Sequence, residues 1–234
     1  MSHYFIPQWT LPSGVRAAIT TVQSPGNLAA HVGADPAAVV RHRRQLCRQL
    51  ALPCAPKWLA QYHSNIPVDF CRVRAGAAAD AIYSNQSSSV CAVLTADCLP
   101  ILMCSADGQE IAAIHAGWRG LAAGIVGRTC AQFAAQRGTL SAYIGPAISQ
   151  TAFEVGDDVY REFEQLGWVD SETFLPHITG KWWANLPLLA EYALREQGIQ
   201  TIVQSNECTF SKADWYSYRR NSTCGRFASL IWRS

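Results

Sequence analysis

Uninterrupted apolar runs separated by short polar breaks dominate the middle of the chain. Residues 91–94, 101–104 and 111–116 each have the pattern of a buried strand, and Asp107-Gly108 before the last run is a strong hairpin signal. An Ala-rich amphipathic pattern then runs from Gly117 to about Arg137 and predicts one helix. We therefore expect three adjacent strands followed by a helix at the centre of the fold.

Periodicity outside this region predicts further helices and strands. Asp35, as an N-cap before Pro36, marks the start of a helix with Val39, Val40 and Leu46 on its buried face. Two more helices are expected over residues 157–167 and 185–197, and strands over residues 15–21, 58–61, 142–144, 199–203 and 227–232. Because strands and helices interleave irregularly, the pattern predicts an α/β fold of the α+β type, with helices packed on a mixed sheet.

Length and composition favour one globular unit. We expect a single domain over residues 1–234, because a chain with 49% hydrophobic residues can bury a sizeable core. The 19 basic and 17 acidic residues are nearly balanced, which argues against a nucleic-acid partner. No apolar run has transmembrane length, no signal-peptide pattern is present, and the nine cysteines form no C-x-x-C pair. These features predict a cytoplasmic protein with reduced thiols and no membrane partner.

A thiol and an imidazole end two of the predicted central strands. Cys98 follows the first of these strands after a polar turn, and His115 lies near the end of the third. Reactive groups are commonly presented at strand ends, so we expect the two side chains within reach of each other. The alternative for each is a buried structural residue, which is common for both residue types.

Two sequence words at these residues resemble the signature of a known family. TADCLPI (95–101) and IAAIHAGWRGLAAGIV (111–126) look like the YfiH-type family, also called the laccase-domain or multicopper polyphenol oxidase family. Gln61-Tyr62-His63 resembles its Gln-x-His-Gly motif, with Ser64 in place of the glycine, and Val22 stands where the family tends to have an arginine. The resemblance spans most of the chain. It implies a pair of mixed β-sheets with helices outside, in α/β/β/α layers.

The resemblance brings His63 together with Cys98 and His115 as a catalytic and metal-binding set. Two imidazoles and a thiolate suit zinc, with copper as a competitor. Three protein ligands leave one tetrahedral position open, as in catalytic zinc sites. The gaps of 35 and 17 residues between these positions match no zinc-finger spacing, so the expectation of a metal depends on the resemblance.

Candidate substrate contacts lie near the same motifs. Arg119, at the predicted helix start, is expected to bind phosphate, because a guanidinium and helix N-terminal amides both favour anions. Arg219 is the second candidate, and for Arg119 a structural arginine bonded to carbonyls is an equal alternative. Asp97 either orients a metal-binding histidine or forms a turn with its own backbone. Aromatic residues that could stack on a purine, or else belong to the core, are Trp118, Trp182, Trp183 and Tyr216.

The resemblance implies a metal-dependent purine nucleoside phosphorylase, which converts adenosine or inosine and phosphate to the base and ribose 1-phosphate. It also implies adenosine deaminase activity, for which a metal ion would activate water to attack C6 of adenine. The expected partners are therefore a purine nucleoside and phosphate. Both reactions use the same candidate site.

Three alternatives remain open from the sequence. A hydrolase with Cys98 as nucleophile would remove an amino acid from a peptidoglycan precursor, a UDP-sugar peptide. A copper-dependent polyphenol oxidase would need many histidines, and the chain has six. A protein whose metal only stabilises the fold would need a fourth ligand, for which Cys91, Cys104 or His31 are the candidates.

Overall fold

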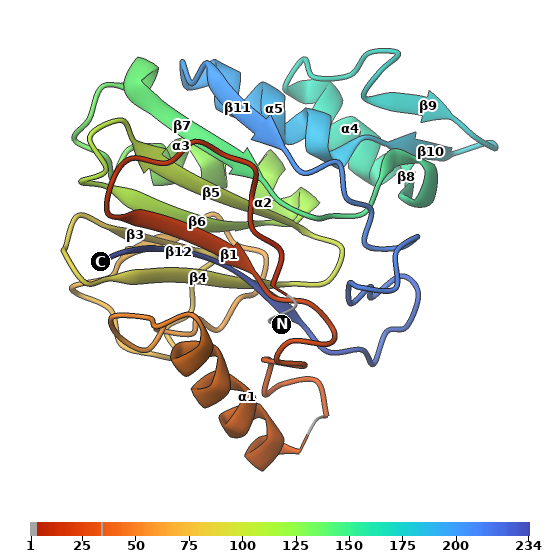
Figure 1. Ribbon diagram of the computed structural model, residues 1–234. Helices are drawn as coiled ribbons and strands as arrows, with labels where there is room; N and C mark the ends of the chain where they lie inside the picture. The colour runs from red at the N-terminus through yellow and green to blue at the C-terminus, as the bar shows by residue number, and fades with distance from the viewer. Residues whose placement is uncertain (1–3, 34) are drawn as a thin grey trace.

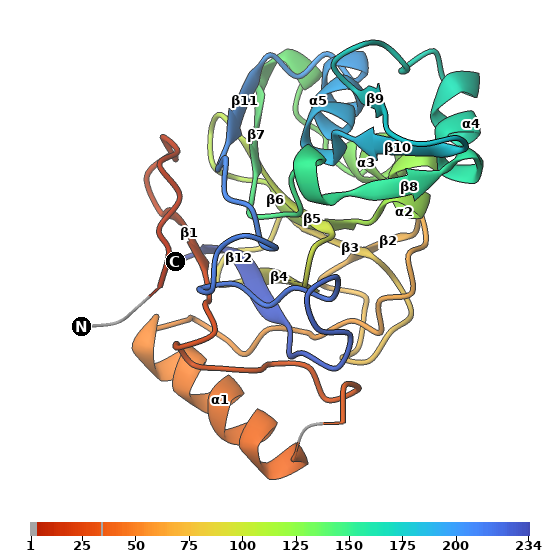
Figure 2. The same ribbon diagram turned by 90° about the vertical axis from the view of Figure 1, so that its right-hand side faces the viewer.

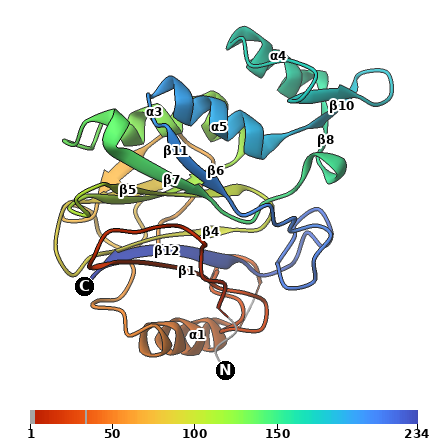
Figure 3. The same cartoon turned by 45° about the horizontal axis from the view of Figure 1, so that its top comes forward.

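Four layers of secondary structure make up the computed structural model, which describes residues 4–33 and 35–234 (Figure 1). Helix α1 (Pro36–Gln49) covers one face of a three-stranded sheet, and the other face of that sheet packs on a six-stranded sheet. Helices α2 (Trp118–Ala122), α3 (Ile125–Cys130) and α5 (Leu186–Glu196) cover the far face of the larger sheet, where Figure 3 shows α3 and α5. The expected α/β/β/α layering is confirmed.

The two sheets differ in strand direction. The three-stranded sheet is antiparallel throughout, in the order β1 (Val15–Ile19), β12 (Phe227–Arg233), β4 (Val90–Thr95). The six-stranded sheet has the order β11 (Thr201–Gln204), β7 (Leu140–Ile144), β5 (Leu99–Ser105), β6 (Ile111–Ala116), β3 (Ala81–Ser84), β2 (Pro67–Asp69). Its two outermost pairs are parallel and the rest antiparallel, so mixed strand direction is found in the larger sheet alone.

A small third sheet lies at one end of the molecule (Figures 1 and 2). It has the order β8 (Glu154–Gly156), β10 (Lys181–Ala184), β9 (Phe174–Pro176), and helix α4 (Asp157–Gln165) contacts it. Two 3-10 turns, Arg137–Thr139 and Gln150–Ala152, lie in the connections. Within the described ranges, the longest helices are too short or too polar to cross a bilayer.

Burial on both faces explains the uninterrupted apolar runs of the central strands. In β5, Ile101 and Met103 face the helices, whereas Leu102 and Cys104 face the three-stranded sheet. Strand β12 is buried in the same way, although its alternating pattern predicted a half-exposed strand. Its alternate side chains pack against α1 on one side and the larger sheet on the other, so neither face meets solvent.

The termini of the predicted helices are largely confirmed. Asp35 caps α1, and its carboxylate accepts hydrogen bonds from the backbone amides of Ala37 and Ala38 at 2.9 and 3.2 Å. Val40 was expected on the buried face but is 47% exposed. The strand expected over residues 58–61 is absent, and a single bridge joins Ala60 to Ala78 in its place. The Gln61 side chain pairs with the backbone of Leu94 in β4.

The helix expected from Gly117 to Arg137 is broken. It divides into α2 and α3 at Gly124, whose φ of 83° lies in the left-handed region, and α3 ends at Cys130. The break makes α2 only five residues long, so its N-terminus carries little of the dipole that was expected to attract phosphate. Anion binding here must depend on side chains.

Gly124→Ala is expected to lower the free energy of unfolding by about 1 kcal/mol, because a Cβ disfavours the left-handed conformation. Urea denaturation would measure the change. Gly138→Ala is the matched control, since its Cβ would meet no atom within 4 Å and its backbone is not left-handed. Equal stability of the two variants would contradict a conformational role for Gly124.

Candidate metal and substrate site

The three predicted ligands meet where the central strands β5 and β6 of the six-stranded sheet begin and end. Antiparallel pairing of β5 with β6 places Pro100 opposite His115, so Cys98, just before β5, lies beside that histidine. His63 reaches the same point from the loop after residue 61, where its φ of 66° turns the chain. The structure therefore brings together side chains that are 35 and 17 residues apart in sequence.

The spacing of the three side chains fits a tetrahedral ion. Their ligand atoms lie within 4.8 Å of one another, and Cys98 Sγ is 3.6 Å from His63 Nε2. Metal bonds of about 2.0 Å to nitrogen and 2.3 Å to sulfur would place those two atoms about 3.5 Å apart. Among the described residues, this is the one group of three or more His, Cys, Asp or Glu side chains with such spacing. His115 is buried, Cys98 is half-buried and His63 is exposed, so the group opens toward solvent.

No candidate fourth ligand belongs to this group. Cys91 and Cys104 are fully buried in the core between the two large sheets, where their thiols face backbone carbonyls. His31 lines the adjoining cavity but is not part of the ligand cluster. The closed site required by a purely structural metal is therefore not formed by these residues.

Asp80 contacts His115, and the sequence did not indicate this contact. It is fully buried just before β3, and its carboxylate lies 2.7 Å from His115 Nδ1. The same carboxylate accepts hydrogen bonds from the backbone amides of Tyr62, His63 and Ser64. Burial opposes its ionisation, but the contacts with His115 and Ser64 prevail and lower the pKa of Asp80 to about 2.

The site favours charge separation between its thiol and its imidazole. Burial disfavours the thiolate, but His115 and His63 outweigh this effect and lower the pKa of Cys98. Burial likewise disfavours the imidazolium, but Cys98 and Asp80 raise the pKa of His115. A divalent cation would replace the shared proton, since metal ligands must be deprotonated.

Asp97 does not orient a histidine. Its carboxylate accepts hydrogen bonds from Thr209 Oγ1, Ser217 Oγ and the backbone amide of Arg219, at 2.6, 3.1 and 2.7 Å. Its φ of 86° sets the turn that precedes Cys98. Asp97 therefore ties the C-terminal segment to this turn, and the contact proposed for it is made by Asp80.

A cavity of about 440 Å³ adjoins the ligand group. Three arginines line it, and they differ in their contacts. Arg219 donates to the carbonyls of Ala152 and Glu154, and Arg226 to those of Cys224 and Gly225. Arg119 is exposed, and its guanidinium lies 4.2 Å from the ring centroid of Trp118.

Arg119 is therefore the most available cation of the cavity. Its guanidinium makes no hydrogen bond to another described residue, so the carbonyl-bonded alternative applies to Arg219 and not to Arg119. The one carboxylate in the lining, that of Asp97, is already engaged by three donors. The cavity therefore has more positive than negative charge available to a ligand, which favours an anion.

The aromatic residues of the cavity are not those expected. Phe153 and Tyr218 line it, whereas none of the four aromatic candidates from the sequence does. Trp182 stacks on Tyr160 with a centroid distance of 4.1 Å, and Trp183 packs against His177.

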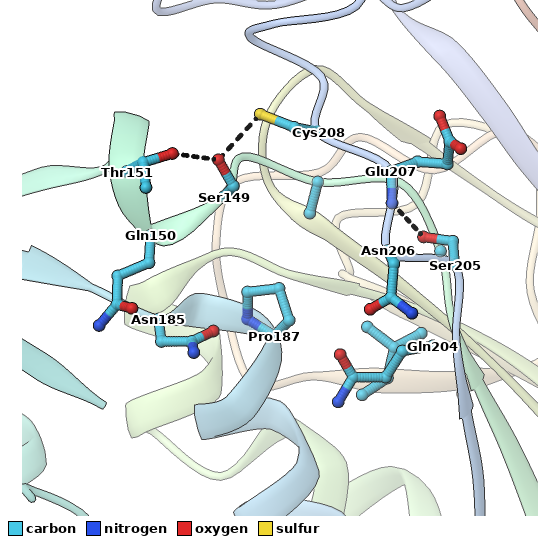
Figure 4. Close-up of a pocket in the computed structure, with 13 residues that line it drawn as sticks. Ser149, Gln150, Thr151, Asn185, Pro187, Gln204, Ser205, Asn206, Glu207 and Cys208 are labelled. Atoms are coloured by element: carbon cyan, nitrogen blue, oxygen red, sulfur yellow. Dashed lines mark hydrogen bonds between the residues drawn. The ribbon is translucent and has the colours of Figure 1, made fainter. Parts of the chain in front are cut away.

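A second cavity of about 300 Å³ lies between the ends of β7 and β11 and the start of α5 (Figure 4). Amide and hydroxyl side chains line it together with Cys208, whose thiol accepts a hydrogen bond from Ser149 Oγ at 3.0 Å. Burial opposes ionisation of this thiol, but bonds from Ser149 and Ser211 lower the pKa of Cys208 to about 7. No histidine lines this cavity, so it lacks the donor set found beside Cys98.

Comparison with known proteins yields full-length relatives. The sequence model of the family described as multi-copper polyphenol oxidoreductase laccase matches residues 14–234. The chain is 41% identical to purine nucleoside phosphorylase YfiH of Shigella flexneri and 40% identical to purine nucleoside phosphorylase PA4543 of Pseudomonas aeruginosa, with 99% of each chain covered. It superposes on the crystal structure of Neisseria meningitidis protein NMB0706 with a TM-score of 0.93, 38% identity and full coverage of both chains.

Proposed function

We propose that this chain, which belongs to the multi-copper polyphenol oxidoreductase laccase family, is a purine nucleoside phosphorylase with a metal centre at His63, Cys98 and His115. The observation that carries the proposal is that one cavity contains both this donor set and the guanidinium of Arg119, which no described residue engages by a hydrogen bond or an ion pair. The names of the curated relatives agree with it. Adenosine deamination is proposed as a second activity of the same site.

Phosphorolysis makes demands that the cavity can meet. Phosphate needs a cationic group, the ribose develops positive charge, and the leaving base needs help to depart. Arg119 supplies the cation for phosphate, and Arg219, whose guanidinium also donates to two backbone carbonyls, lines the same cavity. Phe153 and Tyr218 offer ring faces for a purine, and base stacking on aromatic rings stabilises such complexes by about 1–3 kcal/mol.

The two imidazoles and the thiolate suit zinc, with copper as the alternative. A bound zinc ion supplies a Lewis acid at this position. All three side chains line the cavity, although His115 is buried and His63 is exposed. A ligand in the cavity therefore lies next to the proposed centre.

One experiment tests the proposal as a whole. Purified protein is analysed for zinc and copper, and the same sample is assayed with adenosine or inosine in the presence and absence of phosphate. We expect one zinc ion per chain. We also expect phosphate-dependent release of the base together with an equimolar amount of ribose 1-phosphate. Inosine formed from adenosine without phosphate would report the deaminase activity. Base release that does not depend on phosphate would contradict phosphorolysis.

Arg119→Ala is expected to raise the KM for phosphate about tenfold or more, with a smaller effect on nucleoside binding, because it removes a charge-assisted contact of about 1.5–3 kcal/mol. Kinetics with phosphate varied at saturating nucleoside would measure this. Arg128→Ala is the matched control, since Arg128 is exposed on α3 and does not line the cavity. An unchanged phosphate dependence would assign Arg119 a structural role.

A cysteine hydrolase is the second candidate, and one observation favours it. The Cys98 thiol has a lowered pKa beside two imidazoles, which is also the arrangement of an activated nucleophile. Such an enzyme would act on an amide of a peptidoglycan precursor. A polyphenol oxidase is less favoured, because the described residues form one three-ligand group and multicopper sites use more histidines.

A further inference from the structure

We infer that Asp80 is the positioning residue that holds both histidines of the metal centre in their binding geometry. The inference rests on the metal centre proposed above. Asp80 is not a ligand itself, since it lies outside the cluster formed by the other three side chains. It contacts one histidine through the ring and the other through the main chain.

The ring of His115 is oriented by Asp80. The carboxylate accepts a hydrogen bond from the Nδ1–H of His115 at 2.7 Å, which leaves Nε2 as the nitrogen that faces Cys98 and His63. The main chains are also joined, because the His115 amide donates to the Asp80 carbonyl at 2.7 Å and β3 pairs with β6 immediately afterwards. The distance between the two side chains is therefore fixed by sheet register.

The loop that carries His63 is held by the same carboxylate. Asp80 accepts hydrogen bonds from the amide and the hydroxyl of Ser64, both at 2.7 Å, and from the amide of His63 at 3.0 Å. His63 has a φ of 66°, a conformation that costs a residue other than glycine about 1–2 kcal/mol. Several charge-assisted hydrogen bonds to one buried carboxylate can offset this cost.

Through these two sets of contacts, Asp80 holds candidate ligands that come from different segments of the chain. His63 comes from a loop with no regular structure, whereas His115 belongs to a strand of the core. Without Asp80, the buried His115 ring and the loop amides of residues 62–64 would lose their acceptor together. Metal affinity should then fall even though all three ligands remain present.

Asp80→Asn tests this inference, because it keeps the shape of the side chain and removes the charge and one acceptor oxygen. We expect zinc affinity, measured by competition with a chromophoric chelator, to fall about 10- to 100-fold. The absorption bands of the cobalt-substituted protein should shift as well, since they report the geometry around the ion. Both readouts are independent of enzymatic activity.

Asp170→Asn is the matched control. Asp170 also accepts hydrogen bonds from two backbone amides and two hydroxyls, which belong to Glu172, Thr173 and Tyr192, but it lies outside the cavity. This variant should keep zinc affinity within twofold of the parent and the same cobalt spectrum. A parent protein that binds no zinc would overturn the metal centre, whereas zinc binding unchanged by Asp80→Asn would overturn only the role of Asp80.

A measurement on the unaltered protein covers the case in which Asp80→Asn does not fold. Nitrogen-15 NMR of the zinc-loaded chain should show His115 protonated at Nδ1 and not at Nε2, as the contact with Asp80 requires. A proton on Nε2 would overturn the inference. If His115 shows the expected tautomer but the protein does not catalyse phosphorolysis, the proposed activity is wrong. The positioning role of Asp80 then still holds.

Discussion

Cys98→Ser is expected to lower bound metal and activity together, each by at least about 100-fold. The reason is that the Cys98 thiol lies 3.6 Å from His63 Nε2, in the position of one of three ligands, so its loss leaves two imidazoles to hold the ion. Metal analysis and turnover assays on the same preparation would measure both losses. A nucleophile would behave differently, because its removal abolishes activity with the metal retained.

Alkylation distinguishes the same two roles in the native protein. A metal-bound thiolate shares its electrons with the ion, so Cys98 should react slowly with iodoacetamide until a chelator removes the metal. Cys208→Ser is the matched control, since that thiol also has a lowered pKa but lines the other cavity. This variant should keep metal and activity. A covalent substrate adduct trapped on Cys98 would contradict the ligand role and favour the hydrolase.

The site was predictable where its parts lie in one local pattern. His115 lies near the end of β6 and Cys98 stands just before β5, and the hairpin that joins β5 to β6 sets the register between these two positions. The three adjacent strands expected here are divided between the two sheets, because β4, which Cys98 follows, pairs with β12 in the three-stranded sheet. His63 could be added only through its resemblance to a family motif, because its segment forms no strand and folds through contacts with Asp80. The position of such a loop depends on its partners and not on its own periodicity.

Asp80 could not be predicted for a related reason. Its role depends on the pairing of β3 with β6, a long-range contact that no local pattern indicates. The break at Gly124 was missed because alanine-rich flanks mask a single glycine, and the helix pattern alone does not tell whether that glycine adopts a left-handed conformation. Strand β12 reads as half-exposed because alternation cannot show that a helix covers the second face.

The arginines of the cavity beside the ligand group likewise could not be told apart from the sequence. Arg119 and Arg219 are equivalent as charges in the sequence, yet only the structure shows that Arg219 is engaged by two carbonyls while Arg119 is not. Arg226 joins them from the segment just before β12, through folding of the C-terminal chain over the cavity. Family motifs indicate where the site is, but tertiary contacts decide which of its charged side chains are free to bind a ligand.

Gly117→Ala is expected to disable the metal centre while the fold persists. A Cβ at this position would lie 2.5 Å from His63 Cδ2, closer than non-bonded atoms can approach, and 3.2 Å from Cys98 Sγ, which is a tight contact. The backbone of Gly117 has φ −66° and ψ 160°, which alanine adopts without strain, so the clash with the ligands is the main effect.

The exposed His63 ring is the part that can move away from such a methyl group. Metal sites tolerate ligand shifts of only about 0.2 Å, so zinc affinity and kcat/KM should each fall on the order of 10- to 100-fold with little change in Tm. Chelator competition, turnover assays and thermal unfolding would measure the three quantities, with Gly138→Ala as the control that adds a methyl group in open space. Zinc affinity and kcat/KM within twofold of the parent would show that His63 and Cys98 do not need their close approach, and would contradict a shared ion between them.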